Sequence, residues 1–375
     1  TTTGAEVFAD LSQLPQSMLF YRMWLQFVGG LGVVILALAL LPLLGVANAQ
    51  NMRSDLPGPA KPHQIAPKVV ETAQSLWILY TILWISCVVG LNLLGLDWFT
   101  AICESFSIIS TGGYGLHNAN LGFYQNVYIW YVAMFFMILS SMNFGLHYRA
   151  VMFADWQGYR DNPEAQGFIL GIVFMGLCAV LATDFFSASF ATPTNLVFAV
   201  VALMSSSGHH ISSYAQWPMV YILIMMMLGA VGGCSGSTSG GIKWIRLQFF
   251  TRELGNAISV LLHPRAVIPQ GITLGHDQHT VTTDVILVRG YITAYLLIFF
   301  ACMVVCVAAG LDFSTAFSAV LACVSNTGVG FFGVISNFSD VPALAKCTLV
   351  FAMLVGRIEL LAMLVVLSPS YWRMR

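Results

Sequence analysis

The sequence predicts an all-α polytopic membrane protein. In it, four pseudo-repeats of span, half-helix pore loop and span surround a central pore, with the first repeat incomplete. Three observations support this prediction. The composition is too apolar for a soluble domain, because 58% of the 375 residues are hydrophobic and 8% are charged, against roughly 25% charged residues in soluble domains. Long apolar runs alternate with short ones, and a small polar stretch containing glycine follows each short run.

Charge and cysteine content exclude several functional classes. The formal net charge is -1, whereas a nucleic acid partner calls for a basic patch. Most of the eight cysteines sit inside apolar runs, without a CxxC pair or zinc spacing. We therefore expect buried small side chains and no cofactor. The chain starts at Thr1 without a charged segment before an apolar one, so no signal peptide is expected.

Apolar runs define the expected spans, since about 20 apolar residues cross the hydrocarbon core. Seven runs reach that length: 24–44, 76–96, 127–150, 168–190, 218–247, 285–310 and 347–367. Three shorter runs, 98–109, 194–204 and 313–324, each lie between two long ones. Short helices that enter the membrane and turn back fit this placement, as do simple outer loops. Non-helical backbone at membrane depth must be buried or line a watery cavity.

Basic residues set the orientation. Of the 15 Lys and Arg residues, all but Arg22, Lys346 and Arg357 fall on one side if the short runs enter from the other. By the positive-inside rule, the short runs enter from outside. The outer loops then carry Glu6, Asp10, Asp97, Asp184, Asp312 and Asp340. These acids either concentrate cations at an outer mouth or are ordinary solvated loop residues.

An internal repeat organises the chain. Four polar stretches recur, namely Thr1–Gly4, Ser110–Gly113, Ser205–Gly208 and Ser325–Gly328. Asp97, Asp312 and Thr192 (the last followed by Pro193) mark the expected starts of the half-helices. We divide the chain into the end of repeat 1 (1–50), repeat 2 (68–158), repeat 3 (163–255) and repeat 4 (281–375). Because the other repeats begin about 40 residues before their glycine, a further span and half-helix are expected upstream of Thr1.

The recurring stretch has a specific physical use. Glycine reaches backbone angles that are closed to other residues, so successive carbonyls can point the same way. A half-helix that enters from outside places its partially negative C-terminal end near mid-membrane. Four such ends on one axis favour a cation, and rings of carbonyl oxygens can replace the hydration shell of potassium. The alternative is four ordinary outer turns.

On these motifs, the sequence resembles the Trk/Ktr/HKT superfamily of potassium transporters over essentially its whole length. The resemblance implies four span–pore-helix–span repeats around one pore. The potassium-binding filter residues would then be Thr2, Thr3, Gly4, Thr111, Gly112, Gly113, Ser206, Ser207, Gly208, Asn326, Thr327 and Gly328. The sodium-selective plant branch has serine at the first filter glycine, whereas Gly4 is intact here. The resemblance therefore favours potassium, with rubidium and some sodium passage left open.

A glycine-rich segment interrupts the run at 218–247. Five glycines between 232 and 241 break a helix, since each costs about 1 kcal/mol relative to alanine. In the resembling family this segment is an intramembrane loop that obstructs the pore below the filter, and an arginine of the last span contacts it. The expected gate residues are Gly232, Gly233, Ser235, Gly236, Ser237, Thr238, Gly240, Gly241 and Arg357. A kink for close helix packing, and a salt bridge from Arg357 to an acid such as Glu359, are the alternatives.

The resemblance also implies partners and location. It places the chain in the bacterial cytoplasmic (inner) membrane with the filter entrance facing outside. It further implies a homodimer with a cytoplasmic nucleotide-binding regulatory subunit. The chain itself has no nucleotide motif, because its glycine segment lacks the Gly-Lys-Ser/Thr ending of a phosphate-binding loop.

Two rival functions remain. An intramembrane serine protease of the rhomboid type would use the GxSG motif at 233–236 with Ser235 as nucleophile, but it needs a histidine base. The later spans 285–310 and 347–367 contain no histidine. A secondary transporter with broken helices, for sodium or another monovalent cation, would usually have inverted repeats, whereas these repeats run in the same orientation. An enzyme is therefore not expected.

Overall fold

The computed structural model describes residues 1–43, 69–185, 192–263, 281–335, 337–358, 360 and 363–364. Within these ranges the regular structure is helical, with one isolated parallel bridge between Val231 and Ile242. The α-helices are α1 (Gln16–Leu43), α2 (Val69–Leu93), α3 (Trp98–Ile109), α4 (Val127–Ser141), α5 (Phe144–Phe153), α6 (Gln157–Asp161), α7 (Pro163–Phe185), α8 (Pro193–Met204), α9 (Met219–Ala230), α10 (Trp244–Leu262), α11 (Val281–Ala308), α12 (Phe313–Val324) and α13 (Ala343–Arg357).

Three of these helices are the expected half-helices. α3, α8 and α12 have 12 residues each and begin after the polar residues expected to cap them. Asp97 accepts from the Thr100 amide at 3.1 Å, and Asp312 makes the same contact in α12. Thr192 caps α8 through its hydroxyl, with Pro193 at the first helical position. Local capping therefore fixes where each half-helix starts.

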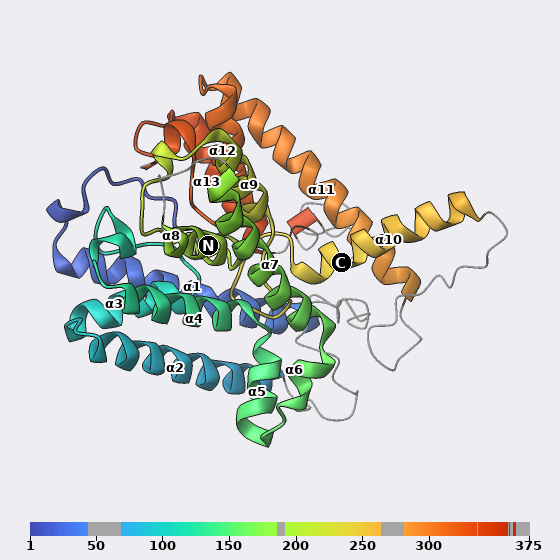
Figure 1. Ribbon diagram of the computed structural model, residues 1–375, viewed down its shortest axis with the longest axis horizontal. Coiled ribbons are helices and arrows are strands. Elements are labelled where there is room, and N and C mark those ends of the chain that lie inside the picture. Colours follow the sequence, from blue (N-terminus) through green and yellow to red (C-terminus); the bar gives the residue numbers. More distant parts are fainter. Residues whose placement is uncertain are drawn as a thin grey trace.

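Each half-helix packs against the spans of its own repeat. α3 contacts α2 and α4, α8 contacts α7 and α9, and α12 contacts α11 and α13. α1, from the end of repeat 1, packs on α3, and the contacts α4–α8 and α9–α12 join neighbouring repeats (Figure 1). Each outer loop also contains one 3-10 turn: η1 (Leu11–Gln13), η2 (Asn120–Phe123), η3 (Tyr214–Gln216) and η4 (Phe332–Val334). The repeat pattern thus extends from helices to loops.

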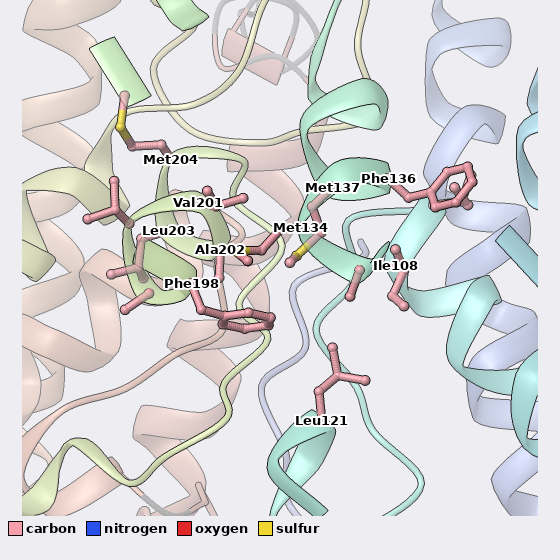
Figure 2. Close-up of a cluster of buried hydrophobic side chains, with 14 of the residues drawn as sticks. Ile108, Leu121, Met134, Phe136, Met137, Phe198, Val201, Ala202, Leu203 and Met204 are labelled. Carbon is pink, nitrogen blue, oxygen red and sulfur yellow. The ribbon is translucent and has the colours of Figure 1, made fainter. Parts of the chain in front are cut away.

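The repeats share a core of buried hydrophobic side chains. Figure 2 shows Ile108 and Leu121 of repeat 2 near Met134 and Met137 of α4. On the other side of this cluster lie α8 residues such as Phe198, which is fully buried. Six of the eight cysteines are buried and all eight are free thiols, which confirms that the buried ones act as small core side chains. The later turns of the half-helices are buried inside the protein, which holds their C-terminal ends in place.

The expected span 127–150 contains a break. It is divided into α4 and α5, which are bent by 98° relative to each other. Asn143 caps α5 by accepting from the Gly145 amide at 2.8 Å. Serine and asparagine side chains form hydrogen bonds with nearby backbone groups, so they favour helix ends over helix interiors. The polar residues in this apolar run therefore lie where one helix ends and the next begins.

The remaining expected spans fit the helices in different ways. In the described part of the chain, three helices are long and apolar enough to cross a membrane, within α2, α7 and α11, or up to four if the bent pair α4–α5 is one span. The run 24–44 lies in α1, whose side chains are described up to Leu31. The run 218–247 is divided into α9 and α10 by the glycine segment. Glu359 and most other residues at the end of run 347–367 fall outside the described residues, as do the segments 44–68, 186–191 and 264–280.

Candidate functional site: a ring of four glycine strands above a buried loop

The three half-helices end in the same turn. In repeat 2 the Thr111 amide donates to the Ile108 carbonyl and the Gly112 amide to the Ser107 carbonyl, the pattern of a Schellman cap. Such a cap needs a left-handed residue, and Thr111 has φ +51°. Ser206 and Asn326 take this position in repeats 3 and 4, and Thr2 has the matching angle in repeat 1. The turn ends each half-helix and starts a strand.

A second left-handed residue follows two positions later in every repeat. The values of φ are +79° at Gly4, +82° at Gly113, +70° at Gly208 and +66° at Gly328. These are the four glycines that the repeat pattern singled out. Because L side chains rarely adopt such angles, glycine suits each of these positions.

The four glycine strands close into a ring. A Cβ atom on Gly113 would lie 2.4 Å from the Ser207 carbonyl oxygen, and one on Gly208 would lie 1.9 Å from that of Thr327. The same relation links Gly328 to Thr3 and Gly4 to Gly112. Each glycine therefore packs on the carbonyl just before the glycine of the next repeat. The four strands converge as expected, and their potassium binding stays a prediction.

A vestibule opens onto this ring. All four glycines line one cavity of about 510 Å³, together with Glu6, His117 and His210 from the loops that follow the glycine strands. Desolvation by burial lowers the pKa of His210 to about 4 and also lowers the pKa of His117. Both imidazoles are therefore neutral near pH 7 and add no positive charge to the mouth. Glu6 pairs with Arg22, whose guanidinium lies 4.5 Å from the Tyr114 ring centroid.

The glycine-rich segment from 232 to 241 lies against the opposite ends of the strands. The Gly240 amide donates to Ser206 Oγ at 2.6 Å, and Thr111 Oγ1 donates to the Thr238 carbonyl at 3.0 Å. A Cβ on Gly240 would lie 2.6 Å from the Ser325 carbonyl oxygen. The segment, here called the glycine loop, therefore touches the half-helix turns of repeats 2, 3 and 4. Of the left-handed residues, Thr111 and Ser206 direct their hydroxyls to it.

The break between α4 and α5 anchors the same loop. The Cys234 and Thr238 amides donate to the Ser141 and Ser140 carbonyls at 2.8 and 3.2 Å, and the Phe144 amide donates to Gly236 at 3.0 Å. Backbone groups left open by the broken helix thus find partners inside the protein. Sequence reasoning missed this arrangement, although two serines and an asparagine inside an apolar run (140–143) were the available signal.

Further hydrogen bonds order the rest of the loop. Gly232 donates to Ile242, and Gly233 donates to Ser239 Oγ at 2.9 Å. Ser237 Oγ donates to the Cys234 carbonyl. Gly236 and Gly241 have φ of +69° and +70°. The Ser235 amide donates to Glu164 Oε1 at 2.6 Å. The loop is a compact hydrogen-bonded element.

Arg357 joins the loop to two other segments. Its guanidinium donates to the Thr238 carbonyl at 2.6 Å, to Gly30 at 2.6 Å and to Gly29 at 3.1 Å. The expected hydrogen bond from Arg357 to the loop is therefore present. The side chain is 8% exposed, so this charge is held by carbonyl oxygens of α1 and of the loop.

Two further buried side chains, neither of them among the predicted site residues, contact the filter strand of repeat 2 or the loop after it. Gln26 Nε2 of α1 donates to the Gly112 carbonyl at 2.8 Å. Glu104, inside α3, accepts from the Leu116 amide at 3.1 Å and from Tyr124 at 3.0 Å, in the loop that follows the filter strand of its own repeat. A polar residue inside an apolar run was the signal in both cases.

A rhomboid-type serine needs a histidine base within reach. The described partner of Ser235 is instead the Glu164 carboxylate, which accepts from the Ser235 amide. His263 lies exposed at the end of α10, and His276 and His279 fall outside the described residues.

Comparison with known proteins agrees with this arrangement. The family model TrkH, described as a cation transport protein, matches residues 1–185 and 188–374. The Trk system potassium uptake proteins TrkH of Vibrio parahaemolyticus and Escherichia coli K12 are 36% and 35% identical, over the whole of this chain and 77% of each relative. The crystal structure of the potassium transporter TrkH from Vibrio parahaemolyticus matches with a TM-score of 0.87 and 34% identity, over 99% of this chain and 76% of that one. The chain therefore belongs to the TrkH family of cation transport proteins.

Proposed function

We propose that this protein takes up potassium across the bacterial cytoplasmic (inner) membrane, with the filter entrance facing outside. The closed ring of glycine strands supports this proposal most directly. The relatives named as potassium uptake proteins support the choice of ion. The distribution of Lys and Arg supports the orientation.

The chemistry of the ring suits an alkali cation. The carbonyls of Thr3, Gly112, Ser207 and Thr327 lie where neighbouring strands meet, and carbonyl oxygens can replace the hydration shell of potassium. No carboxylate belongs to the four filter stretches. A weakly hydrated monovalent ion therefore fits the site better than a divalent one.

Transport of potassium is tested with the complete protein in cells that lack their own uptake systems. We expect growth rescue at low potassium and rubidium tracer uptake that potassium suppresses more strongly than sodium does. A Gly113→Asp variant of matched membrane abundance serves as the inactive control. If sodium suppresses rubidium uptake as strongly as the same concentration of potassium does, potassium is not the preferred ion.

We further propose that the glycine loop gates the ion path and that Arg357 holds it shut. The loop touches the strands of three repeats from the side opposite the vestibule. Arg357 fixes it through Thr238 and also brings a positive charge that repels a cation. Movement of this one element would open the path.

Replacement of Arg357 tests the gate. We expect Arg357→Ala to raise basal rubidium uptake, and Arg357→Lys to act in the same direction because an ammonium lacks the planar fork that bridges several carbonyls. Arg149→Lys is the matched control, since Arg149 forms an exposed pair with Asp155 and such pairs contribute about 0–1 kcal/mol. Unchanged uptake and unchanged regulation in both Arg357 variants would contradict the gate.

A homodimer with a cytoplasmic nucleotide-binding regulatory subunit completes the proposal. The resemblance to the superfamily supports it, together with the "Trk system" in the names of the relatives. Light scattering of the purified protein measures the oligomeric state. Nucleotide-dependent uptake by proteoliposomes containing the co-purified partner tests its regulation, and equal uptake with and without nucleotide would count against it.

A further inference from the structure

A side-chain relay joins repeat 3 to a filter carbonyl of repeat 2. His209, directly after the filter glycine Gly208, contacts Asn120 Oδ1 through Nδ1 at 2.8 Å. Asn120 Nδ2 donates to the Gly113 carbonyl, also at 2.8 Å. His209 is fully buried, Asn120 is 4% exposed, and Asn120 is held at φ +51°.

The partners fix the direction of every bond in this relay. The Gly113 carbonyl can only accept, so the amide nitrogen of Asn120 faces it. The Leu121 amide can only donate, and it contacts Asn120 Oδ1 at 2.8 Å. That oxygen therefore accepts a second hydrogen bond, which requires a proton on His209 Nδ1. The imidazole thus orients the amide, and the amide orients the carbonyl.

The relay is specific to one corner of the ring. The four 3-10 turns begin with Leu11, Asn120, Tyr214 and Phe332, so an amide stands at this position in η2 alone. The residues after the four glycines are Ala5, Tyr114, His209 and Val329. Together with Gln26 on the Gly112 carbonyl, the relay gives repeat 2 two filter carbonyls that accept side-chain amide hydrogen bonds.

We propose that Asn120 and His209 are positioning residues that set ion selectivity at the outer end of the filter. This inference rests on the proposed potassium uptake. A carbonyl that accepts an amide hydrogen bond is fixed in direction and shares its electron density with the donor. It cannot collapse onto an ion smaller than potassium, so the corner disfavours sodium. Loss of the relay frees the Gly113 carbonyl and admits sodium more readily.

Asn120→Ala tests the amide against a matched control. Asn118→Ala makes the same change in the same loop, but Asn118 is exposed and contacts Leu11 and the outer loop of repeat 1. The measured quantity is the ratio of inhibition by sodium to inhibition by potassium, both acting on rubidium uptake. In Asn120→Ala we expect this ratio to rise about fivefold over the wild type, which corresponds to the loss of a hydrogen bond with a net value of ~1 kcal/mol. Asn118→Ala keeps the wild-type ratio.

Two replacements of His209 separate positioning from packing. Asn places its amide nitrogen where imidazole Nδ1 lies, whereas Gln places it near Nε2. We expect His209→Asn to keep the wild-type sodium-to-potassium inhibition ratio and His209→Gln to shift it as Asn120→Ala does. Because both residues act through one carbonyl, the double variant Asn120→Ala/His209→Gln should shift the ratio no further than either single change.

The outcomes distinguish this inference from the proposed function. If the wild-type protein takes up potassium and both Asn120→Ala and His209→Gln keep its inhibition ratio, the relay does not set selectivity. If the maximal rate falls and the ratio stays fixed, the residues only support the fold. If the wild-type protein does not transport potassium, the proposed function itself fails. Membrane abundance is measured for each variant, and His209→Gln decides the test where Asn120→Ala does not accumulate.

Discussion

At the residue scale, the filter combines two kinds of left-handed position. Thr2, Thr111, Ser206 and Asn326 adopt angles that L residues rarely take, at about 1–2 kcal/mol each. Their hydrogen-bonded turns and side-chain contacts offset this strain. Asn326, for example, donates to Thr3 Oγ1 at 2.8 Å and to the Met353 carbonyl at 3.0 Å.

The four filter glycines meet a stricter demand, because both their φ angles and their surroundings exclude a side chain. We expect Gly208→Ala to abolish most rubidium uptake, since its Cβ would lie 1.9 Å from the Thr327 carbonyl oxygen and the angle adds about 1–2 kcal/mol. Gly255→Ala is the control, because nothing lies within 4 Å of its Cβ. Normal uptake by Gly208→Ala would contradict the closed ring.

At the element scale, the break between α4 and α5 and the glycine loop support each other. The broken helix exposes the Ser140 and Ser141 carbonyls and the Phe144 amide, and the loop binds all three. The loop in turn separates α9 from α10, so the open backbone groups of two broken runs satisfy each other inside the protein. Moving one requires the other to find new partners.

This dependence predicts that a cap of α5 affects the gate. Asn143→Ala removes the acceptor for the Gly145 amide, so we expect a loss of about 1 kcal/mol in stability together with higher basal uptake. Asn143→Ser keeps a capping oxygen, so its stability and its basal uptake should both stay close to those of the wild type. Asn126→Ala removes the cap of α4, which is distant in sequence from the break, and should lower stability alone. If Asn143→Ala, Asn143→Ser and Asn126→Ala all have the same basal uptake, the α4–α5 break does not influence gating.

At the scale of the whole molecule, three carboxylates that cap helices in separate repeats stay ionised over a wide pH range. Hydrogen bonds from Ser314 and Thr315 lower the pKa of Asp312 to about 2, and those from Ser12 lower that of Asp10. Hydrogen bonds from Thr100 lower the pKa of Asp97. Because these pKa values are depressed, the contribution of the ionised caps to stability is full above about pH 4, the ordinary value. It is lost as the pH falls through the folded value, about 2 for Asp312.

Neutralising these acids should weaken capture of the cation without disturbing the fold. In the triple variant Asp10→Asn/Asp97→Asn/Asp312→Asn the capping oxygens remain. We expect a higher half-saturating potassium concentration at low ionic strength, and no difference from the wild type near 1 M of an impermeant salt, where the Debye length is about 3 Å. Uptake by proteoliposomes measures both, and a salt-independent difference would rule out steering by the field.

The three half-helices, their caps and the four glycines could be predicted from the sequence alone. These features are local: apolar length, a capping side chain and a backbone angle depend on residues a few positions apart. The hydrogen bond from Arg357 to the glycine loop was also expected, but from the resemblance to a family rather than from local pattern.

Three features could not be predicted without the folded chain. They are the α4–α5 break, the left-handed Thr111 and Ser206, and the relay from His209 to Gly113. Each depends on partners distant in the chain, since His209 meets Asn120 across 89 positions and Thr111 meets Thr238 across 127. A side-chain period reports which face of a helix is apolar. It does not report which far segment will satisfy an open carbonyl or amide, because that depends on how the four repeats close around one axis.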